Sequence, residues 1–262
     1  MTSPCLSKVS MSDTAINMNI KKNLLDLFFP KFCLGCKKEG FYLCPDCKET
    51  LDISQFNYCL CDKNPLRLPP NEKHGKCPKC QDKKLSGLYF ALPYKEKELT
   101  RKLIYQFKYP PYLKDLAKTF ASLIIEHLIL SGKNTDEIWQ DGVLVPVPLE
   151  RKKFNERGYN QSEELANELS KVLKIPVVSD CLLKTKSTAP QMTLKKEERE
   201  NNLLGAFSIP NCGVSDTPQF SGKKVFLVDD VYTTGSTMHE CAKVLKSAGA
   251  KSVWGICIAR DG

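Results

Sequence analysis

The chain has 262 residues, of which 42% are hydrophobic and 26% are charged, so it can bury a sizeable core. No apolar run reaches the roughly 18 residues that a membrane-spanning helix needs, and the first residues lack the basic and then apolar pattern of a secretory signal. We therefore expect a cytoplasmic protein with no membrane span, made of one medium-sized domain and a small appendage.

The formal net charge of +9 is concentrated in the first half of the chain. Residues 1–90 carry fourteen Lys and Arg against nine Asp and Glu, and residues 91–130 carry seven against four. This excess indicates an anionic partner for the front half, although solvated surface lysines would give the same pattern.

The predicted elements divide the chain into three parts. Residues 1–20 are expected to be a disordered extension, and residues 21–86 a small Cys-rich domain. Periodicity and turn residues predict, in chain order, helix 22–29, strand 87–94, helices 96–109 and 113–130, strand 143–147, helix 163–173 capped by Ser162, strand 175–178, helix 194–201, strand 225–228, helix 237–247 and strand 252–259. Because strands alternate with helices from residue 87 onward, residues 87–262 are predicted to form an α/β domain with a mainly parallel sheet.

Eight of the thirteen cysteines occur in pairs with metal-knuckle spacing. Cys33-x2-Cys36 and Cys44-x2-Cys47 are seven residues apart, which predicts one tetrahedral zinc site. Cys59-x-Cys61 and Cys77-x2-Cys80 predict a second site, although the single-residue gap at Cys59/Cys61 departs from the usual two and the pairs could interleave between the two sites. We expect one or two structural zinc ions, which would fold a segment too poor in apolar residues to fold alone.

Basic and aromatic residues lie among these cysteines. They are Lys37, Lys38, Lys76, Lys79, Lys83 and Lys84 with Phe41, Tyr42 and Tyr58. Such interleaving suits a single strand of nucleic acid, whereas a purely structural role of the knuckles is the alternative.

The most specific pattern is VFLVDDVYTTGST at residues 225–237. Four apolar residues predict a strand buried on both faces, and Asp229 and Asp230 follow at its carboxyl end, where ligands bind in open α/β sheets. The next helix leaves N–H donors and a positive dipole at its N-terminus, and Gly235 lets the backbone approach an anion closely.

The hydroxyls of this segment complete a sugar-phosphate site. Thr233, Thr234, Ser236 and Thr237 supply further hydrogen-bond donors. A carboxylate only accepts, so Asp229 and Asp230 would repel a phosphate but can accept from two vicinal ribose hydroxyls. The segment therefore predicts a ribose 5-phosphate site, and an ordinary strand–turn–helix with capping residues is the alternative.

A basic segment follows the strand predicted at 143–147. Arg151, Lys153 and Arg157 suit a pyrophosphate group, since Arg can engage two oxygens at once, and Gly158 permits a tight turn beside Arg157. A solvated basic face is the alternative.

Residues 225–237 resemble the phosphoribosyl pyrophosphate loop of type I phosphoribosyltransferases, although Tyr232 is bulkier than the aliphatic residue often found there. The chain shares further motifs with the ComF family of competence proteins, which it resembles from about Met18 to the C-terminus. These motifs are Val145-Pro146-Val147-Pro148, RGYNQ at 157–161, Gln191 with Leu194, Arg199 and Asn202, Lys108 in YQFKY, and the cysteine knuckles.

The resemblance implies a type I phosphoribosyltransferase fold, which is Rossmann-like, with an N-terminal zinc ribbon. It implies that Asp229 and Asp230 hold the ribose hydroxyls of phosphoribosyl pyrophosphate or a ribonucleotide. The residues implied to cradle the 5-phosphate are Val231, Tyr232, Thr233, Thr234, Gly235, Ser236 and Thr237. Pyrophosphate would lie at the Pro-Val-Pro turn and the basic residues after it, and magnesium would bind through substrate oxygens and water.

Three functions stay open at this point. The first is a DNA-uptake protein of natural transformation that binds single-stranded DNA and phosphoribosyl pyrophosphate, with a DNA-uptake helicase and recombination proteins as further partners. The second is an active phosphoribosyltransferase, of the glycosyltransferase class, acting on a nucleobase or amine by displacement at the anomeric carbon. The third is a nucleotide-sensing adaptor without turnover. No residue of the sequence stands out as a general base.

Overall fold

The computed structural model describes residues 30–62, 64–69, 72, 75–95, 98–185, 205–210 and 220–261. The predicted extension at 1–20, the helices at 22–29 and 194–201 and the segment that contains Gln191, Arg199 and Asn202 lie outside the described residues. The chain divides into two compact units, Met1–Thr50 and Leu51–Gly262.

The smaller unit contains the first two cysteine pairs and helix α2 (Pro45–Glu49). Cys44 is the N-cap of this helix, and its side chain accepts a hydrogen bond from the Cys47 amide. Pro45 suits the first helical position, where no amide hydrogen is needed. The helix has five residues, none of them buried; Cys44 caps it and Cys47 lies within it.

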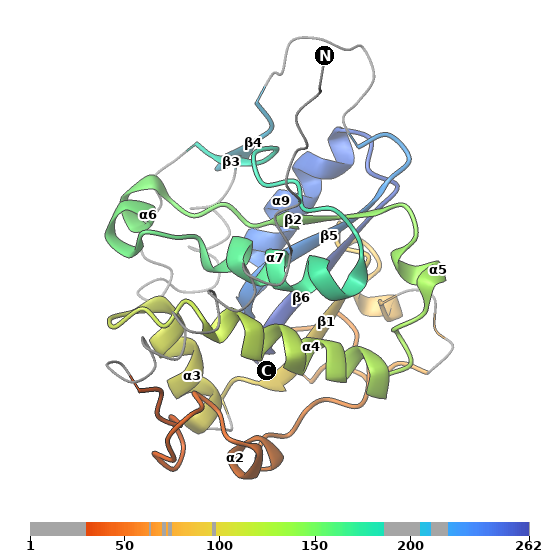
Figure 1. Ribbon diagram of the computed structural model, residues 1–262. Coiled ribbons are helices and arrows are strands. Elements are labelled where there is room, and N and C mark those ends of the chain that lie inside the picture. Colours follow the sequence, from red (N-terminus) through yellow and green to blue (C-terminus); the bar gives the residue numbers. More distant parts are fainter. Residues whose placement is uncertain are drawn as a thin grey trace, which may run out of the picture. The chain divides into compact units, whose positions relative to one another are not determined.

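The larger unit is built on a four-stranded parallel sheet (Figure 1). In spatial order its strands are β1 (Gly87–Pro93), β6 (Ser252–Arg260), β5 (Lys224–Tyr232) and β2 (Gly142–Pro146). Beyond β2, backbone hydrogen bonds join Leu144 to Pro176 and Val178, so the strand predicted at 175–178 is reduced to a single bridge. The predicted α/β class and mainly parallel sheet are confirmed.

Helices cover both faces of this sheet (Figure 1). On one face α4 (Leu116–Leu130) packs against β1 and β6, and α7 (Gln161–Leu173) packs against β5 and β2, while α3 (Glu98–Lys108) packs against α4. On the other face α9 (Ser236–Ser247) packs against β5 and β6. It does so because Met238, Cys241 and Leu245 recur at helical spacing and are buried.

The described residues between 87 and 261 contain four short elements that were not predicted. They are the helices α5 (Asp136–Trp139) and α6 (Arg151–Arg157) and the antiparallel pair β3 (Leu183–Lys184) and β4 (Phe207–Ser208). None of the helices in the described ranges is both long and apolar enough to cross a membrane.

Residues 51–86 belong to the larger unit, although the sequence placed the domain boundary after residue 86. Leu60, Leu68 and Leu85 are buried in the same core as sheet residues such as Phe90 and Val225. These contacts attach the second pair of knuckles, with the short 3-10 helix η1 (Pro78–Cys80), to the α/β domain. Cysteine spacing alone does not reveal this packing.

The carboxyl ends of all four strands lie at one edge of the sheet, because the strands are parallel. Strand β5 runs four residues beyond its predicted end, since Asp229, Val231 and Tyr232 pair with Cys257, Ala259 and Arg260 of β6. The predicted site therefore begins within the sheet and not in a loop after it.

Candidate functional site

Asp229 and Asp230 lie next to each other near the end of β5. Asp229 Oδ1 accepts hydrogen bonds from the Asp230 amide (2.9 Å) and from Ser162 Oγ (3.1 Å). Asp230 Oδ1 accepts from the Val231 amide (2.6 Å) and lies 2.9 Å from Lys108 Nζ. Among the described residues, each carboxylate thus receives its protein donors on Oδ1, and Oδ2 of each is available to another donor.

Lys108 offsets the charge of this acidic pair. Burial, and then the neighbouring Asp230 carboxylate, raise the pKa of Asp229 to about 7. Burial lowers the pKa of Lys108, but the Asp230 and Asp229 carboxylates outweigh it and leave that pKa raised. At neutral pH the site therefore holds the ion pair Lys108–Asp230 and, next to it, the Asp229 carboxyl group, which is partly protonated.

The tyrosine and glutamine of the RGYNQ motif hold Lys108 in place. Tyr159 Oη donates to the Phe107 carbonyl (2.6 Å), and Gln161 Nε2 donates to the same oxygen (3.3 Å). Both side chains are buried, so they satisfy an otherwise orphaned carbonyl at the last turn of α3. These contacts fix the end of α3 to the start of α7, and from there Lys108 reaches Asp230 of β5.

The asparagine of the motif positions the serine. Asn160 Oδ1 accepts from the Ser162 amide (3.1 Å), so Asn160 caps α7 and the predicted cap, Ser162, is wrong. Asn160 Nδ2 also donates to the Val147 carbonyl (3.0 Å) and ties α7 to the Pro-Val-Pro turn. Because its own hydroxyl is not needed for capping, Ser162 can donate to Asp229.

The turn after β5 leads directly into α9. Gly235 is the N-cap of that helix, with φ of 75°, a conformation that favours glycine. Thr234 Oγ1 lies 2.7 Å from Ser236 Oγ and accepts from the Ser236 amide (3.4 Å). The first turn of α9 therefore presents backbone N–H groups and hydroxyls at the edge of the sheet where the two acids lie.

Tyr232 is part of the predicted loop, but its side chain points into the core. It is 1% exposed, and its hydroxyl lies 3.3 Å from His239 Nε2 of α9. A Cβ built on Gly235 would lie within 3.0 Å of the Tyr232 ring and hydroxyl, closer than real Cβ atoms come. Tyr232 can therefore contact a ligand only through its backbone, while its ring supports the turn from below.

The predicted pyrophosphate ligands Arg151, Lys153 and Arg157 lie on α6. The Arg157 guanidinium lies 5.6 Å from the ring centroid of Tyr109. In the part of the chain that the structure describes, none of the three makes a hydrogen bond or ion pair with residues 229–237. The short helix begins four residues after Val147, whose amide donates to the Val228 carbonyl of β5 (2.9 Å).

Lys184 of β3 is a further cation near the site that sequence analysis missed. Burial lowers its pKa, the nearby Glu150 opposes that shift, and Lys153 adds to it. Asp229 also acts on Lys184. No local pattern around residue 184 indicates this position, because a chain segment far from both β5 and α6 in sequence brings it there.

The eight knuckle cysteines form the two groups that their spacing predicts, without interleaving. Within each group the four Sγ atoms lie within 4.8 Å of one another, and the Cys36–Cys44 and Cys61–Cys77 sulfur pairs are 3.5 Å apart. A tetrahedral zinc ion with bonds of about 2.3 Å needs sulfurs about 3.8 Å apart. Each cluster can therefore hold one structural zinc ion.

Backbone amides point at several of these sulfurs. Cys33 Sγ accepts from the Cys44 amide (3.4 Å), Cys59 Sγ from the Leu66 amide (3.1 Å) and Cys80 Sγ from the Cys77 amide (3.2 Å). Such donors stabilise thiolates, the form that binds a metal. The donor set thus fits zinc in both clusters.

Comparison with known proteins agrees with these features. A family model described as a phosphoribosyl transferase domain matches residues 160–262. Competence protein F of Haemophilus influenzae is 31% identical over 240 residues, which cover 88% of this chain and 99% of that protein. DNA utilization protein YhgH of Escherichia coli is 28% identical over 83% of this chain and 96% of its own length, and competence protein ComFC of Bacillus subtilis is 34% identical over 45% of each chain. With a relative this similar along nearly its whole length, the chain belongs to the ComF family of competence proteins.

Proposed function

We propose that this protein acts in DNA uptake by binding phosphoribosyl pyrophosphate at the end of β5 and single-stranded DNA on a neighbouring surface. The observation that carries the first part is the juxtaposition of two carboxylates, whose Oδ2 atoms accept from none of the described residues, and the N-terminus of α9. The acids suit the two ribose hydroxyls, and the helix N-terminus suits the 5-phosphate five to seven residues further along the chain.

Lys108 makes this arrangement compatible with a polyanionic ligand. Two carboxylates alone would repel a substrate that carries three phosphate groups. The Lys108–Asp230 ion pair, 2.9 Å long, cancels one of these charges and leaves the Oδ2 atoms to accept from ribose. Ser162 fixes the second carboxylate from α7.

The diphosphate would extend toward α6. Arg151, Lys153 and Arg157 lie on that helix, which follows the Pro-Val-Pro turn bonded to β5, and Lys153 acts electrostatically on Lys184. Magnesium would come with the substrate, because it binds mainly through phosphate oxygens and water. These basic residues are the groups we assign to the diphosphate.

Isothermal titration calorimetry with phosphoribosyl pyrophosphate and magnesium tests this site. We expect one ligand per chain and much weaker binding of ribose 5-phosphate, which lacks the diphosphate. Binding of a ribonucleotide in place of phosphoribosyl pyrophosphate would favour the nucleotide-sensing alternative. A protein that takes up none of these ligands would contradict the proposed site.

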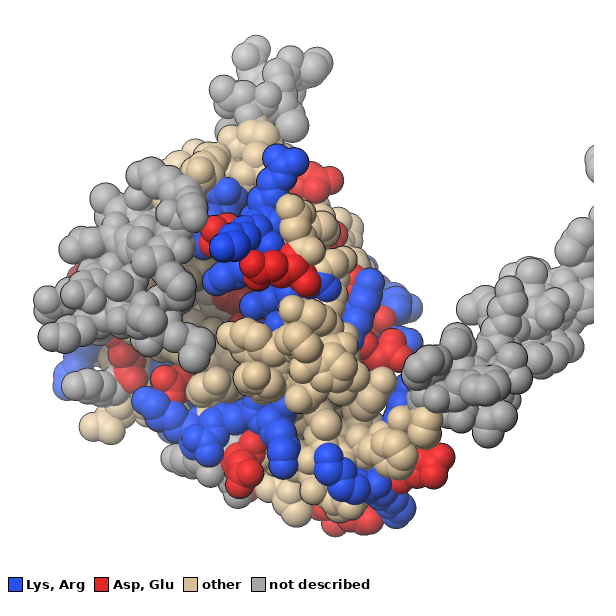
Figure 2. Space-filling model, turned by 90° about the vertical axis from the view of Figure 1, so that its left-hand side faces the viewer, with Lys and Arg blue, Asp and Glu red and all other residues tan. Residues whose placement is uncertain are grey.

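The second part of the proposal concerns a surface on α3 and α6. Tyr105 is 54% exposed, and its ring centroid lies 4.7 Å from that of Tyr109. Arg157 covers Tyr109, and Phe154 is exposed on the same helix as Arg157. On the face shown in Figure 2, Lys and Arg side chains lie among uncharged and acidic side chains. Exposed aromatic rings beside cations suit the stacked bases and phosphates of a single strand.

The second cysteine cluster is less suited to DNA than its sequence indicated. Lys83 Nζ donates to the Leu60 carbonyl (2.6 Å) and pairs with Asp62 (2.9 Å), and the Tyr58 ring packs against Phe90. Lys76 Nζ donates to the Gln81 carbonyl (3.1 Å). Their polar or aromatic groups are thus engaged within the protein. Relatives named for competence and for DNA utilization support a DNA-related role for the chain as a whole.

Fluorescence anisotropy with a labelled single strand tests this surface. We expect affinity to fall steeply as salt rises, because phosphate contacts release counterions, and Tyr105→Ala to weaken binding by about tenfold through lost stacking. The control is Leu130→Ala, at an exposed apolar position at the C-terminal end of α4, outside the surface on α3 and α6. This substitution should leave the affinity for DNA unchanged. If the two substitutions change the affinity for DNA equally, α3 and α6 do not form the DNA-binding surface.

A further inference from the structure

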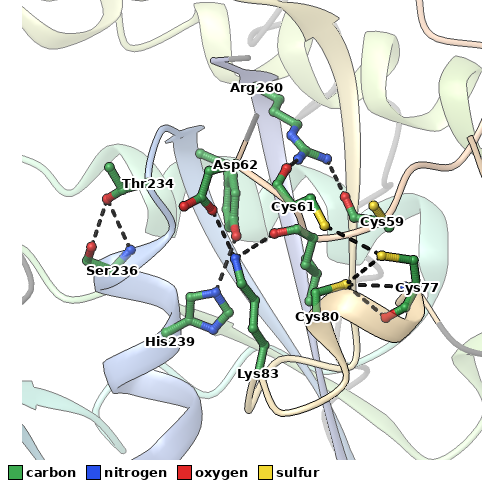
Figure 3. A network of polar contacts seen from close by, with 12 residues as sticks. Cys59, Cys61, Asp62, Cys77, Cys80, Lys83, Thr234, Ser236, His239 and Arg260 are labelled. Atoms are coloured by element: carbon green, nitrogen blue, oxygen red, sulfur yellow. Dashed lines mark hydrogen bonds and ion pairs between the residues drawn. The ribbon is translucent and has the colours of Figure 1, made fainter. Parts of the chain in front are cut away.

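The second cysteine cluster is connected to the sheet through Arg260, the last residue of β6 (Figure 3). The Arg260 side chain is 2% exposed. Its Nη1 donates to the Cys59 carbonyl (2.8 Å), and its Nη2 donates to the Cys61 carbonyl. Arg260 therefore binds the backbone of two of the four cysteines that can hold a metal.

Arg260 is a buried cation without a carboxylate partner among the described residues. Burying an unpaired charge is costly, so a compensating group is expected nearby. Four thiolates around one zinc ion carry a net negative charge, and this cluster contains the two cysteines whose carbonyls Arg260 binds. Arg260 thus fits the cluster best when the metal is bound.

Arg260 also contacts the residue beneath the predicted phosphate loop. Arg260 and Tyr232 are paired across β6 and β5, and the Arg260 guanidinium lies 5.6 Å from the Tyr232 ring centroid. The Tyr232 ring in turn lies against Gly235, close enough to exclude any Cβ there. One continuous set of contacts therefore runs from Cys59 and Cys61 to the N-cap of α9.

A second connection runs along the same side. Lys83 follows Cys80 by three residues and binds the Leu60 carbonyl and the Asp62 carboxylate, which fixes the loop that carries Cys59 and Cys61. His239 of α9 lies 3.3 Å from the Tyr232 hydroxyl. Figure 3 shows His239, Lys83 and Asp62 converging between α9 and the cluster. Tyr232 is thus held between α9 and residues that the cluster organises.

We propose that Arg260 and Tyr232 are positioning residues that make the geometry of residues 233–237 depend on metal occupancy of the second cluster. The part that concerns ligand affinity rests on the proposed ribose-phosphate site. When the four thiolates are joined by a metal, the carbonyls of Cys59 and Cys61 are fixed, and they hold Arg260 against Tyr232. When the cluster opens, Arg260 loses these acceptors and Tyr232 no longer supports the glycine of the turn.

Hydrogen–deuterium exchange of the full chain tests the coupling without any ligand. Cys61→Ser opens the second cluster, and Cys36→Ser, at the first cluster, is the matched control. We expect each variant to contain one zinc ion fewer per chain by elemental analysis. Only Cys61→Ser should speed exchange in peptides that cover residues 232–239, by about tenfold, while α7 at 161–173 exchanges as in the wild type.

Arg260→Lys provides a second test for the case in which Cys61→Ser does not fold. Lysine keeps the charge but cannot donate to two carbonyls at once. We expect this variant to keep both zinc ions, to speed exchange at 232–239 and to weaken phosphoribosyl pyrophosphate binding by about tenfold. Unchanged exchange at 232–239 in Arg260→Lys overturns the inference.

The same experiments separate this inference from the proposed function. If the wild-type protein binds no phosphoribosyl pyrophosphate but its variants show faster exchange at 232–239, the coupling is supported and the proposed ligand is wrong. If the wild-type protein binds phosphoribosyl pyrophosphate and Arg260→Lys alters neither the exchange pattern nor the affinity, the proposed ligand is supported and the coupling is wrong.

Discussion

Replacing Asp229 and Asp230 together by asparagine is expected to weaken phosphoribosyl pyrophosphate binding by about a hundredfold while the protein stays folded. Each ionised carboxylate contributes a charge-assisted hydrogen bond to a ribose hydroxyl, worth about 1.5 kcal/mol or more, so the loss of two amounts to about 3 kcal/mol. Asparagine has nearly the same shape, and its Oδ1 can still accept from Ser162, from Lys108 and from the backbone amides that the aspartates bind now. Calorimetry measures the affinity, and circular dichroism checks the fold.

The control is a second adjacent acidic pair. Asp136→Asn with Glu137→Gln removes the same charge from exposed positions on α5, which precedes β2 and so lies toward the opposite edge of the sheet. This variant should bind as the wild type does. A comparable loss of affinity in both double variants would mean that overall charge, and not contact with ribose, explains the effect.

The pH dependence of binding provides an independent check on the same carboxylates. Because the pKa of Asp229 is raised to about 7, affinity for phosphoribosyl pyrophosphate should fall as the pH falls through 7 and Asp229 gains a proton. Stability has the opposite sign: a carboxyl whose pKa is higher in the folded state stabilises the fold at low pH, and this contribution is lost as the pH rises from about 4 to about 7. In the Asp229→Asn, Asp230→Asn variant both trends should flatten.

The local part of the site could be predicted from the sequence. Strand β5, its two acids and the glycine before α9 are consecutive residues, and their order in the chain fixes their order at the edge of a parallel sheet. The cysteine groups are local in the same sense, since each pair is one turn of backbone.

The parts that were missed depend on contacts between distant residues. Lys108 reaches Asp230 because Tyr159 binds the carbonyl of Phe107, 52 residues away, and a carbonyl acceptor leaves no mark on the sequence. The direction of Tyr232 was missed because β5 was predicted to end at residue 228, which left no strand alternation to assign its face. The domain boundary was missed because Leu60 and Leu85 pack against the sheet rather than within a separate knuckle domain.

Gly235→Ala is expected to have the second large effect, because two costs coincide at this position. The φ of 75° disfavours any residue with a Cβ by about 1 kcal/mol. The Cβ would also lie within 3.0 Å of three atoms of the Tyr232 side chain, which is 1% exposed and cannot move aside without opening the core. Either the turn or Tyr232 must shift, and a shift of the turn moves the N–H groups that we assign to the 5-phosphate.

Gly222→Ala separates the two costs. Gly222 has a φ of 72°, but a Cβ there would meet nothing within 4 Å. We expect Gly222→Ala to lower the free energy of unfolding by about 1 kcal/mol and to leave ligand affinity unchanged. Gly235→Ala should lower it by about 3 kcal/mol and weaken phosphoribosyl pyrophosphate binding by about a hundredfold. Urea unfolding and calorimetry measure both quantities. If the two alanine variants have the same free energy of unfolding and the same affinity for phosphoribosyl pyrophosphate, the Tyr232 ring does not set the shape of this turn. In that case the contacts of Arg260 with the second cysteine cluster do not influence the ligand site through Tyr232.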